Sequence, residues 1–369
     1  MDPDNGNDEY DGQTRRWAKQ SIQDALDSIP VVQTGGSPAV PVNARHGGRI
    51  HCMDGRHDVG SGLVMRRGLP IELDGVYNPV LRTSTSGGEM IMKGPTLYSS
   101  DTIKPQSLIR LGLAADDEIN QNAYGHKFRN LIWEMAGVTK YCVDAERWNM
   151  GLVEGCSWRH LDLATEPDSF CVRNQGENIG GSDCSWIHMV DNEFNSSGLY
   201  RNTAPTTQGL NANHHCFNRN IGFSGGTRTE AMISLENAQG CWIEGNNLEV
   251  VRGTGGNKTM AIEFRPSPGG NGNKQNYIGG NTGEFADFFL VADEFWANLV
   301  FETGCRVTTR DQADPDDNSK LIWFKTNALA NFVIDGVTTP YGGSYDQSPI
   351  ARVVDGIQNT ILDTGILPA

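Results

Sequence analysis

Short stretches of alternating hydrophobic and polar residues follow one repeated phrase along most of this chain. Each copy begins at a small or polar anchor residue and often ends at a turn residue, as in 240–245, 275–280, 298–302 and 331–336. The anchors of nine copies are spaced 25, 28, 32, 25, 35, 23, 33 and 28 residues apart: Asn130, Gly155, Asp183, His215, Gly240, Gln275, Asn298, Asn331 and Asn359. One strand per unit, with loops of varying length, is typical of a solenoid. The pattern therefore predicts an all-β coil whose function lies on its outer faces and loops.

The repeats also predict which side chains stack, because successive side chains of a strand point to opposite faces. One inward column would hold these residues: Leu131, Cys156, Cys184, Cys216, Cys241, Asn276, Leu299, Phe332 and Thr360. A second inward column would hold these: Trp133, Trp158, Trp186, Asn218, Ile243, Ile278, Phe301, Ile334 and Leu362. The position between them should point outward, yet it is largely apolar: Ile132, Ser157, Ser185, Phe217, Trp242, Tyr277, Val300, Val333 and Ile361. Such a stripe needs a cover, which is either another copy of the chain or long loops such as 192–212 and 250–274.

Four of the eight cysteines fall in the first predicted column. Neighbouring strands lie about 4.8 Å apart, a separation compatible with disulfides. Stacked, reduced thiols that act as small hydrophobic side chains are the alternative. Neither a Cys-x-x-Cys pair nor a paired-histidine spacing is present, so we expect no metal site, and no cofactor is implied.

A second row of outward residues is predicted in the strand before each repeat, and it is charged: Asp144, Arg173, Arg201, Glu236, Arg265, Lys325 and Asp355. Mixed signs at stacking distance favour a solvated ladder of ion pairs. A substrate groove is the alternative.

The beginning of the chain differs from the repeats. Residues 1–13 are polar and are expected to form a flexible or docking arm. Residues 14–29 carry apolar side chains at helical spacing, with Pro30 after them, so we expect a capping helix and loop over 14–46. The coil itself is expected to occupy 47–369.

Three segments near this start carry a family resemblance. The sequences Ser-Ile-Gln-Asp-Ala-Leu at 21–26, Gly-Gly-Arg-Ile at 47–50 and Leu-Pro-Ile-Glu-Leu-Asp-Gly at 69–75 resemble the opening of the pectate-lyase-like right-handed parallel β-helix superfamily. That resemblance implies a helix that caps the first coil of a β-helix. The superfamily includes polysaccharide lyases, glycoside hydrolases, epimerases and viral tailspikes, so it implies no single activity. Its tailspikes are typically trimers, which makes a homotrimer the first expectation for the apolar stripe.

The net charge is −15, with 9 Lys beside 21 Arg and 27 Asp beside 18 Glu. An acidic surface disfavours binding to nucleic acid. Few lysines and many aspartates are typical of proteins from highly saline environments, and an acidic extracellular protein is the alternative. No run of eighteen apolar residues occurs, so we expect no membrane insertion. The N-terminus shows no apolar stretch of a secretory signal.

Candidate functional residues are of two kinds. His188, Asp191 and Glu193 could share one rim of a central coil as a catalytic group, although Asn-Thr-Asp, Gly-His-Gly and Asp-Asp motifs of polygalacturonases are absent there. Solvated side chains in turns are the alternative explanation. Phe217, Trp242 and Tyr277 lie in the apolar stripe, where aromatic rings would serve as a glycan-binding platform or a subunit interface.

Together these observations favour a virion surface spike, either a tailspike-like fibre or a capsid decoration. We expect it to be a homotrimer that attaches to other virion proteins through its N-terminal arm and contacts polysaccharide or glycoprotein glycans of the host cell, with a halophilic system as one setting. A secreted, extracellular polysaccharide lyase or glycoside hydrolase is the alternative.

Overall fold

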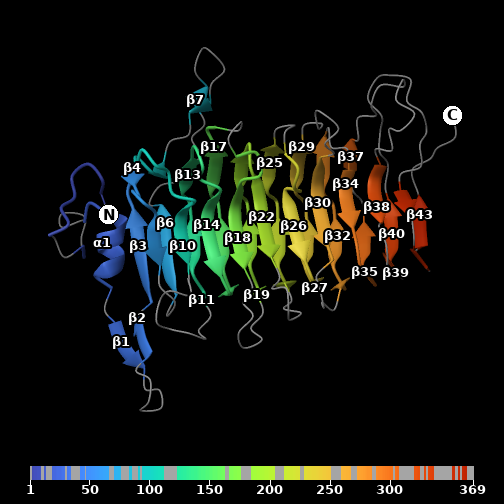
Figure 1. Cartoon of the computed structure of the whole chain (residues 1–369), viewed down its shortest axis with the longest axis horizontal. Helices are drawn as coiled ribbons and strands as arrows, with labels where there is room; N and C mark the ends of the chain where they lie inside the picture. Colours follow the sequence, from blue (N-terminus) through green and yellow to red (C-terminus); the bar gives the residue numbers. More distant parts are fainter. Residues whose placement is uncertain are drawn as a thin grey trace.

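The coil predicted from the repeats is present. The structure is a computed structural model that describes residues 2–9, 12–13, 19–29, 31–34, 42–45, 47–65, 70–75, 83–84, 90–91, 94–111, 123–162, 166–175, 184–203, 212–224, 228–250, 259–266, 272–284, 288–301, 304–306, 320–324, 328–329, 331–335, 351–353, 356–357 and 360–363. Short parallel strands stack side by side along one long axis, with helix 22–27 at one end of the stack and strand 360–363 at the other (Figure 1). The predicted right-handed parallel β-helix is confirmed.

Each full coil contributes strands to four sheets, which we call sheets I to IV. In the described residues, sheet I has eleven strands: β3 (Gly48–Cys52), β6 (Ile71–Gly75), β12 (Lys127–Arg129), β16 (Leu152–Glu154), β20 (His188–Val190), β24 (Cys216–Asn218), β28 (Trp242–Glu244), β32 (Tyr277–Gly279), β36 (Leu299–Phe301), β40 (Phe332–Asp335) and β43 (Thr360–Asp363). Sheet II has nine in the same part of the chain: β4 (Gly55–Asp58), β9 (Pro95–Tyr98), β13 (Ile132–Met135), β17 (Ser157–His160), β21 (Glu193–Asn195), β25 (Ile221–Ser224), β29 (Asn247–Val250), β33 (Thr282–Glu284) and β37 (Gly304–Arg306).

Sheet III lies across the coil from sheet I, and its ten described strands are these: β5 (Leu63–Met65), β10 (Ser107–Leu111), β14 (Tyr141–Glu146), β18 (Phe170–Gln175), β22 (Gly198–Thr203), β26 (Ile233–Glu236), β30 (Met260–Arg265), β34 (Phe288–Ala292), β38 (Lys320–Phe324) and β41 (Ala351–Val353). Sheet IV has seven two-residue strands within the described ranges: β19 (Cys184–Ser185), β23 (Ala212–Asn213), β27 (Ala238–Gln239), β31 (Asn273–Lys274), β35 (Phe295–Trp296), β39 (Ala328–Leu329) and β42 (Gly356–Ile357). Three further strand pairs are small: parallel β11 (Ala123–Tyr124) with β15 (Trp148–Asn149), and antiparallel β1 (Val31–Thr34) with β2 (Val42–Arg45) and β7 (Thr83–Ser84) with β8 (Met90–Ile91).

The predicted capping helix is shorter than expected. Helix α1 (Ile22–Asp27) begins at the N-cap Ser21, whose side chain accepts a hydrogen bond from the backbone N–H of Asp24. Ile22 and Leu26 are buried, and the helix contacts β3 and β5 of the first coil. It therefore covers the open end of the hydrophobic interior. Residues 14–18 lie outside the described part, and the expected domain boundaries stay predictions.

The two corners that flank sheet I turn through residues with positive φ. Between sheets IV and I these are Gly125, Met150, Trp186, His214, Gly240, Gln275 and Ala297. Between sheets I and II they are Asn130, Gly155, Asp191, Arg219, Gly245 and Gly280. Because both corners make the same turn and lead into a strand, one sequence phrase can mark either corner.

That ambiguity explains an error in the predicted register. The repeats at Asn130 and Gly155 lead into sheet II, whereas those at Gly240 and Gln275 lead into sheet I. The predicted cysteine column is wrong as a result. Cys184 lies in sheet IV opposite Ala212, Cys216 lies in sheet I between His188 and Trp242, and Cys156 and Cys241 lie at two different corners. The seven cysteines whose side chains the structure describes are free thiols, and the fold stands without the column.

The interior is filled by the middle residue of each sheet I strand and by large rings from sheet II. The buried sheet I column runs as follows: Val153, Met189, Phe217, Ile243, Ile278 and Val300. In sheet II, Trp133 and Trp158 are neighbours inside the coil, as predicted. Phe194 stacks on Trp158 with ring centroids 5.0 Å apart. The next residue in this column is Gly222, and only glycine fits there because a Cβ would overlap the Phe194 ring.

Two columns of buried asparagines follow the corner residues, and neither was predicted from the sequence. The column between sheets I and II contains Asn192, Asn220, Asn246 and Asn281. The column between sheets IV and I contains Asn276, Asn298 and Asn331. Each amide nitrogen donates to the amide oxygen in the next coil, at 2.8 or 2.9 Å. These amides satisfy the backbone groups that the corners would leave unpaired.

The predicted outward apolar stripe does not exist as a single surface. Ile132, Ser157, Phe217 and Val300 are buried, while Trp242 is 46% exposed. Phe217 therefore cannot belong to a surface platform or a subunit interface, and the stripe no longer supports a trimer. Val333 and Ile361 lie in strands whose side chains are outside the described part.

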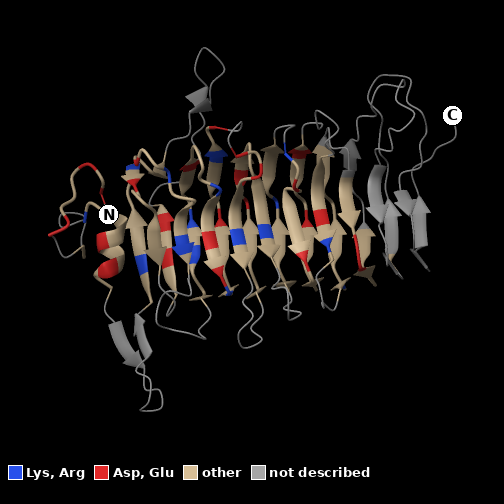
Figure 2. Ribbon diagram, in the orientation of Figure 1, with Lys and Arg blue, Asp and Glu red and all other residues tan. Residues whose placement is uncertain are grey.

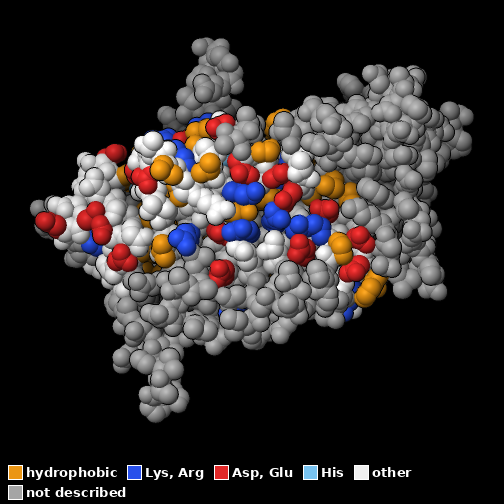
Figure 3. All heavy atoms as spheres, in the orientation of Figure 1, with side chains coloured by type: hydrophobic (Ala, Val, Ile, Leu, Met, Phe, Trp, Pro, Cys, Tyr) orange, Lys and Arg blue, Asp and Glu red, His pale blue; other side chains and the backbone are white. Residues whose placement is uncertain are grey.

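The charged row on sheet III is confirmed for its first members only. Asp144, Arg173 and Arg201 are in register, and Arg173 donates to Asp144 at 2.8 Å. Glu236 and Arg265 pair with each other at 3.0 Å, two positions farther along their strands. Lys325 and Asp355 lie outside the described residues. Figure 2 shows basic and acidic residues interspersed along the strands of this sheet, and Figure 3 shows their side chains side by side across the middle of this face, the arrangement of an ion-pair ladder.

Candidate functional site

The outer face of sheet I carries a column that changes character along the axis. The first outward residue of each strand is in register with its neighbours: Arg49, Glu72, Lys127, Leu152, His188, Cys216, Trp242, Tyr277 and Leu299. The column is charged at its N-terminal end and apolar or aromatic afterwards. Trp242 and Leu299 are 46% and 37% exposed. Exposed apolar side chains that gather in this way mark binding surfaces.

The corner beside this column adds a second set of large exposed side chains. Met150 and Trp186 are 59% and 48% exposed, although both occupy positive-φ positions where Gly125 and Gly240 serve in other coils. The left-handed conformation costs a non-glycine residue about 1–2 kcal/mol. A glycine could make the same turn without this cost. The presence of large side chains at these two positions therefore favours a function for them on the surface.

Trp186 is held in a ring stack with His214 of the next coil. The ring centroids are 4.6 Å apart and the ring planes differ by 9°. Since coils repeat about every 4.8 Å, this stacking runs along the axis of the β-helix. His214 covers one face of the indole, and the other face is turned toward the coil of Met150.

Trp242 and Tyr277 form a second stack farther along the axis. Their ring centroids are 4.2 Å apart and the planes differ by 32°. The indole N–H of Trp242 donates to the Glu244 carboxylate at 2.7 Å. The Tyr277 ring lies over Gly279, where a Cβ would overlap it. Both rings are therefore held in place before any ligand arrives.

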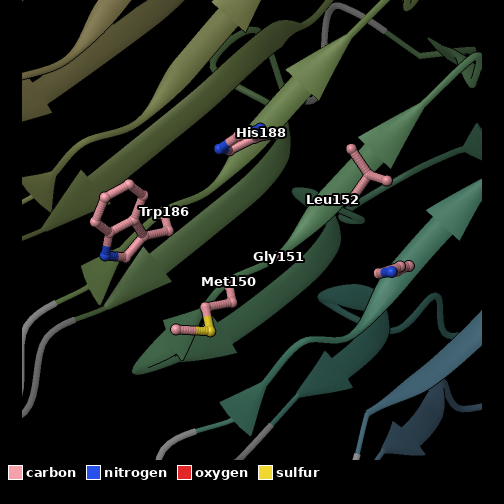
Figure 4. Close-up of a pocket in the computed structure, with 6 residues that line it drawn as sticks. Met150, Gly151, Leu152, Trp186 and His188 are labelled. Atoms are coloured by element: carbon pink, nitrogen blue, oxygen red, sulfur yellow. The ribbon is translucent and has the colours of Figure 1, made fainter.

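A shallow pocket lies at the charged end of the aromatic surface. It has a volume of about 470 Å³ and is lined by Lys127, Met150, Gly151, Leu152, Trp186 and His188. Figure 4 shows Met150, Leu152, Trp186 and His188 around Gly151, which contributes no side chain. The pocket combines an indole face, aliphatic side chains and groups that can donate hydrogen bonds, a mixture suited to a sugar.

The predicted catalytic residues are not gathered in one pocket. His188 points outward from sheet I, Glu193 belongs to sheet II, and Asp191 forms the corner between them. The Asp191 carboxylate accepts two hydrogen bonds from the Arg219 guanidinium, each 2.7 Å long. A carboxylate paired in this way suits a structural contact better than proton donation. A catalytic role for these residues stays a prediction.

Two buried histidines, His126 and His215, have a structural role inside the coil. Burial lowers the pKa of His126 to about 4 and that of His215 to about 3. In each, the Nδ1 atom accepts a backbone N–H from the preceding coil, from Ile71 and Ile187 respectively. Among the described residues, no group of His, Cys, Asp and Glu side chains could hold a metal ion.

No protein-family model matches the chain, and no curated protein matches it significantly. Among solved structures, DFA-IIIase from Arthrobacter chlorophenolicus A6 in complex with GF2 aligns with a TM-score of 0.57 at 11% identity, over 92% of this chain and 88% of that one. The same protein without its lid gives 0.56 at 12% identity, over 86% and 79%. This chain is a right-handed parallel β-helix. The likeness shows the fold alone.

A tailspike protein mutant of E. coli bacteriophage HK620 aligns more weakly. Its TM-score is 0.40 at 11% identity, over 92% of this chain and 61% of that one. In the described part of the β-helix, no helix is long and apolar enough to cross a membrane.

Proposed function

We propose that this β-helix binds polysaccharide along the outer face of sheet I and acts as a host-contacting spike on a virion surface. One observation carries the proposal: two preformed ring stacks, Trp186 with His214 and Trp242 with Tyr277, lie exposed on neighbouring coils. Sugar rings present apolar C–H faces that pack on aromatic rings, which offer large, rigid contact areas. A series of stacks along the axis suits a polymer better than a small ligand.

The proposed spike is a homotrimer on the surface of a virion. Ile221 and Phe223 on β25 are 53% and 39% exposed on sheet II, and a homotrimer would remove such side chains from water. The mass in solution, measured at high and at low salt, tests this assembly. A monomer in every condition would remove the trimer from the proposal and leave glycan binding standing.

Binding is tested by affinity electrophoresis of the purified chain in gels that contain acidic or neutral polysaccharides. Trp186→Ala and Trp242→Ala are each expected to weaken binding about tenfold, because a lost ring contact is worth about 1.4 kcal/mol. Ile103→Ala, which removes a large exposed side chain between β9 and β10, is the control and should bind as the unaltered chain does. Equal binding by all the variants would refute the proposed site.

The same polymers distinguish a spike from an extracellular polysaccharide lyase or glycoside hydrolase. A binding protein leaves the polymer intact, whereas a lyase releases unsaturated ends and a hydrolase releases reducing ends. If the unaltered chain released such products and the variant Asp191→Asn or Glu193→Gln did not, the protein would be an enzyme and the proposed spike would be wrong.

A further inference from the structure

We propose that the pocket between β12 and β20 is a subsite for an anionic substituent, a carboxylate or a sulfate, on the bound polysaccharide. This inference rests on the proposed glycan-binding function and names the class of glycan. It follows from the placement of one lysine and from the ion pairs that surround it.

The pocket has room for a sugar beside an available ring face. His214 covers the Trp186 indole on the side of the following coil, so the opposite face borders the pocket with Met150 and Leu152. The strands β12, β16 and β20 are consecutive in sheet I, which places Lys127 and His188 roughly 10 Å apart along the axis. A sugar on the indole can therefore direct a substituent toward Lys127.

Lys127 is a cation without a counter-ion in the described part of the chain. Its register neighbours are Glu72 on β6 and Leu152 on β16. The Glu72 carboxylate forms ion pairs with Arg49 at 3.5 Å and with Arg129 at 3.3 Å. No ion pair with a described residue engages the Lys127 ammonium, which lines the pocket.

Arg129 removes the nearby negative charge. In sheet I it is in register with Asp74 and Glu154, and its guanidinium binds the carboxylates of Glu72 and Glu154, at 3.3 Å and 3.0 Å. Arg49 also pairs with Asp74, so the two arginines engage all three carboxylates of this end of the face. Lys127 is the cation of this group that makes no direct ion pair with a described residue and lines the pocket. A protein with a net charge of −15 repels anionic polymers at long range, but screening limits that repulsion to about 8–10 Å. Within this distance the local cation decides which ligand is favoured.

Two matched pairs of polymers test the inference: dextran sulfate with dextran, and polygalacturonate with its carboxyl-reduced form. The sulfate and the carboxylate arms identify which anion the subsite accepts. Affinity is measured for the unaltered chain, Lys127→Gln, Lys127→Arg and the control Lys274→Gln. Lys274 on β31 lies roughly 24 Å away along the axis, beyond the screening length.

We expect the unaltered chain to prefer at least one charged polymer to its neutral partner about tenfold. Lys127→Gln should abolish this preference without weakening the neutral polymer, and Lys127→Arg and Lys274→Gln should keep it. Equal affinity for charged and neutral forms, or a preference that survives Lys127→Gln, overturns the inference and leaves glycan binding intact. Binding of none of the four polymers overturns the proposed function as well.

Discussion

His215 is expected to make the stability of the coil depend on pH. Its side chain is buried, its Nδ1 accepts the Ile187 N–H at 3.2 Å, and its Nε2 lies 3.1 Å from the Tyr200 hydroxyl oxygen. Because Ile187 can only donate, Nδ1 must be unprotonated and Nε2–H donates to Tyr200. The folded chain therefore holds the neutral imidazole, and burial lowers its pKa to about 3.

The sign follows from the bound protons. Unfolded histidine has a pKa near 6.5, so between that value and about 3 the unfolded chain binds a proton that the folded chain does not. Stability is complete above pH 6.5 and falls as the pH decreases through this window. At pH 4, about 2.5 pH units below the pKa of the unfolded histidine, protonation stabilises the unfolded chain relative to the folded chain by about 3 kcal/mol.

The variant His215→Asn isolates this effect. An asparagine does the same work elsewhere in this column, where Asn276 accepts the Cys241 N–H at 2.9 Å. Urea denaturation at pH 7 and at pH 4 gives the loss of unfolding free energy for each protein. We expect His215→Asn to lose about 3 kcal/mol less between the two pH values than the unaltered chain. Comparing the two losses removes any constant cost of the substitution.

His214→Asn is the matched control, because it makes the same substitution at the exposed neighbouring residue. The reasoning is refuted if His215→Asn loses as much stability on acidification as the unaltered chain. It is equally refuted if NMR shows His215 titrating near pH 6 in the folded protein.

Three further outcomes are expected. Asn220→Ala should lower the unfolding free energy by about 2–4 kcal/mol in urea, because Asn220 donates to the Met189 carbonyl and accepts from Asn192 inside the coil; a loss below 1 kcal/mol would contradict the ladder. Gly279→Ala should displace the Tyr277 ring and weaken polysaccharide binding severalfold at unchanged folding, measured by affinity electrophoresis and circular dichroism; unchanged affinity would show that the ring position is unimportant. Cys216, whose pKa is raised by burial and by a nearby carboxylate, should be the first of the described thiols to react with a maleimide, faster at alkaline pH, and bound polymer should slow the reaction; mass spectrometry of peptides tests both points.

The sequence was sufficient for the class of fold and for part of the surface. Repeats of this length with one strand each predicted the solenoid, and alternation placed Trp133 and Trp158 inside and Trp242 and Tyr277 outside. The register failed because two corners of the coil require the same left-handed turn, so Gly155 and Gly240 look alike although they lead into different sheets. Only long-range pairing separates them.

The remaining site residues could not be found from alternation. Met150 and Trp186 stand in corners, where the period of two is interrupted, and Trp186 was assigned to the interior for that reason. The pocket brings Lys127 together with Trp186 and His188, which follow it by 59 and 61 residues in the sequence. The asparagine columns did leave a signal, an Asn that recurs directly after the turn residue, as in 191–192 and 219–220.

The asparagine ladder makes each coil an interchangeable module. Asn220 is bonded to Asn192 before it and Asn246 after it through the same atoms, so excising the 26 residues between one rung and the next rejoins identical partners. Such an edit shortens the protein by one coil and keeps the amide ladder continuous, while ring packing such as that of Phe194 on Gly222 would need a compensating substitution. Insertion or deletion of whole coils would therefore change the length of polymer that the molecule can bind, in steps of about 4.8 Å.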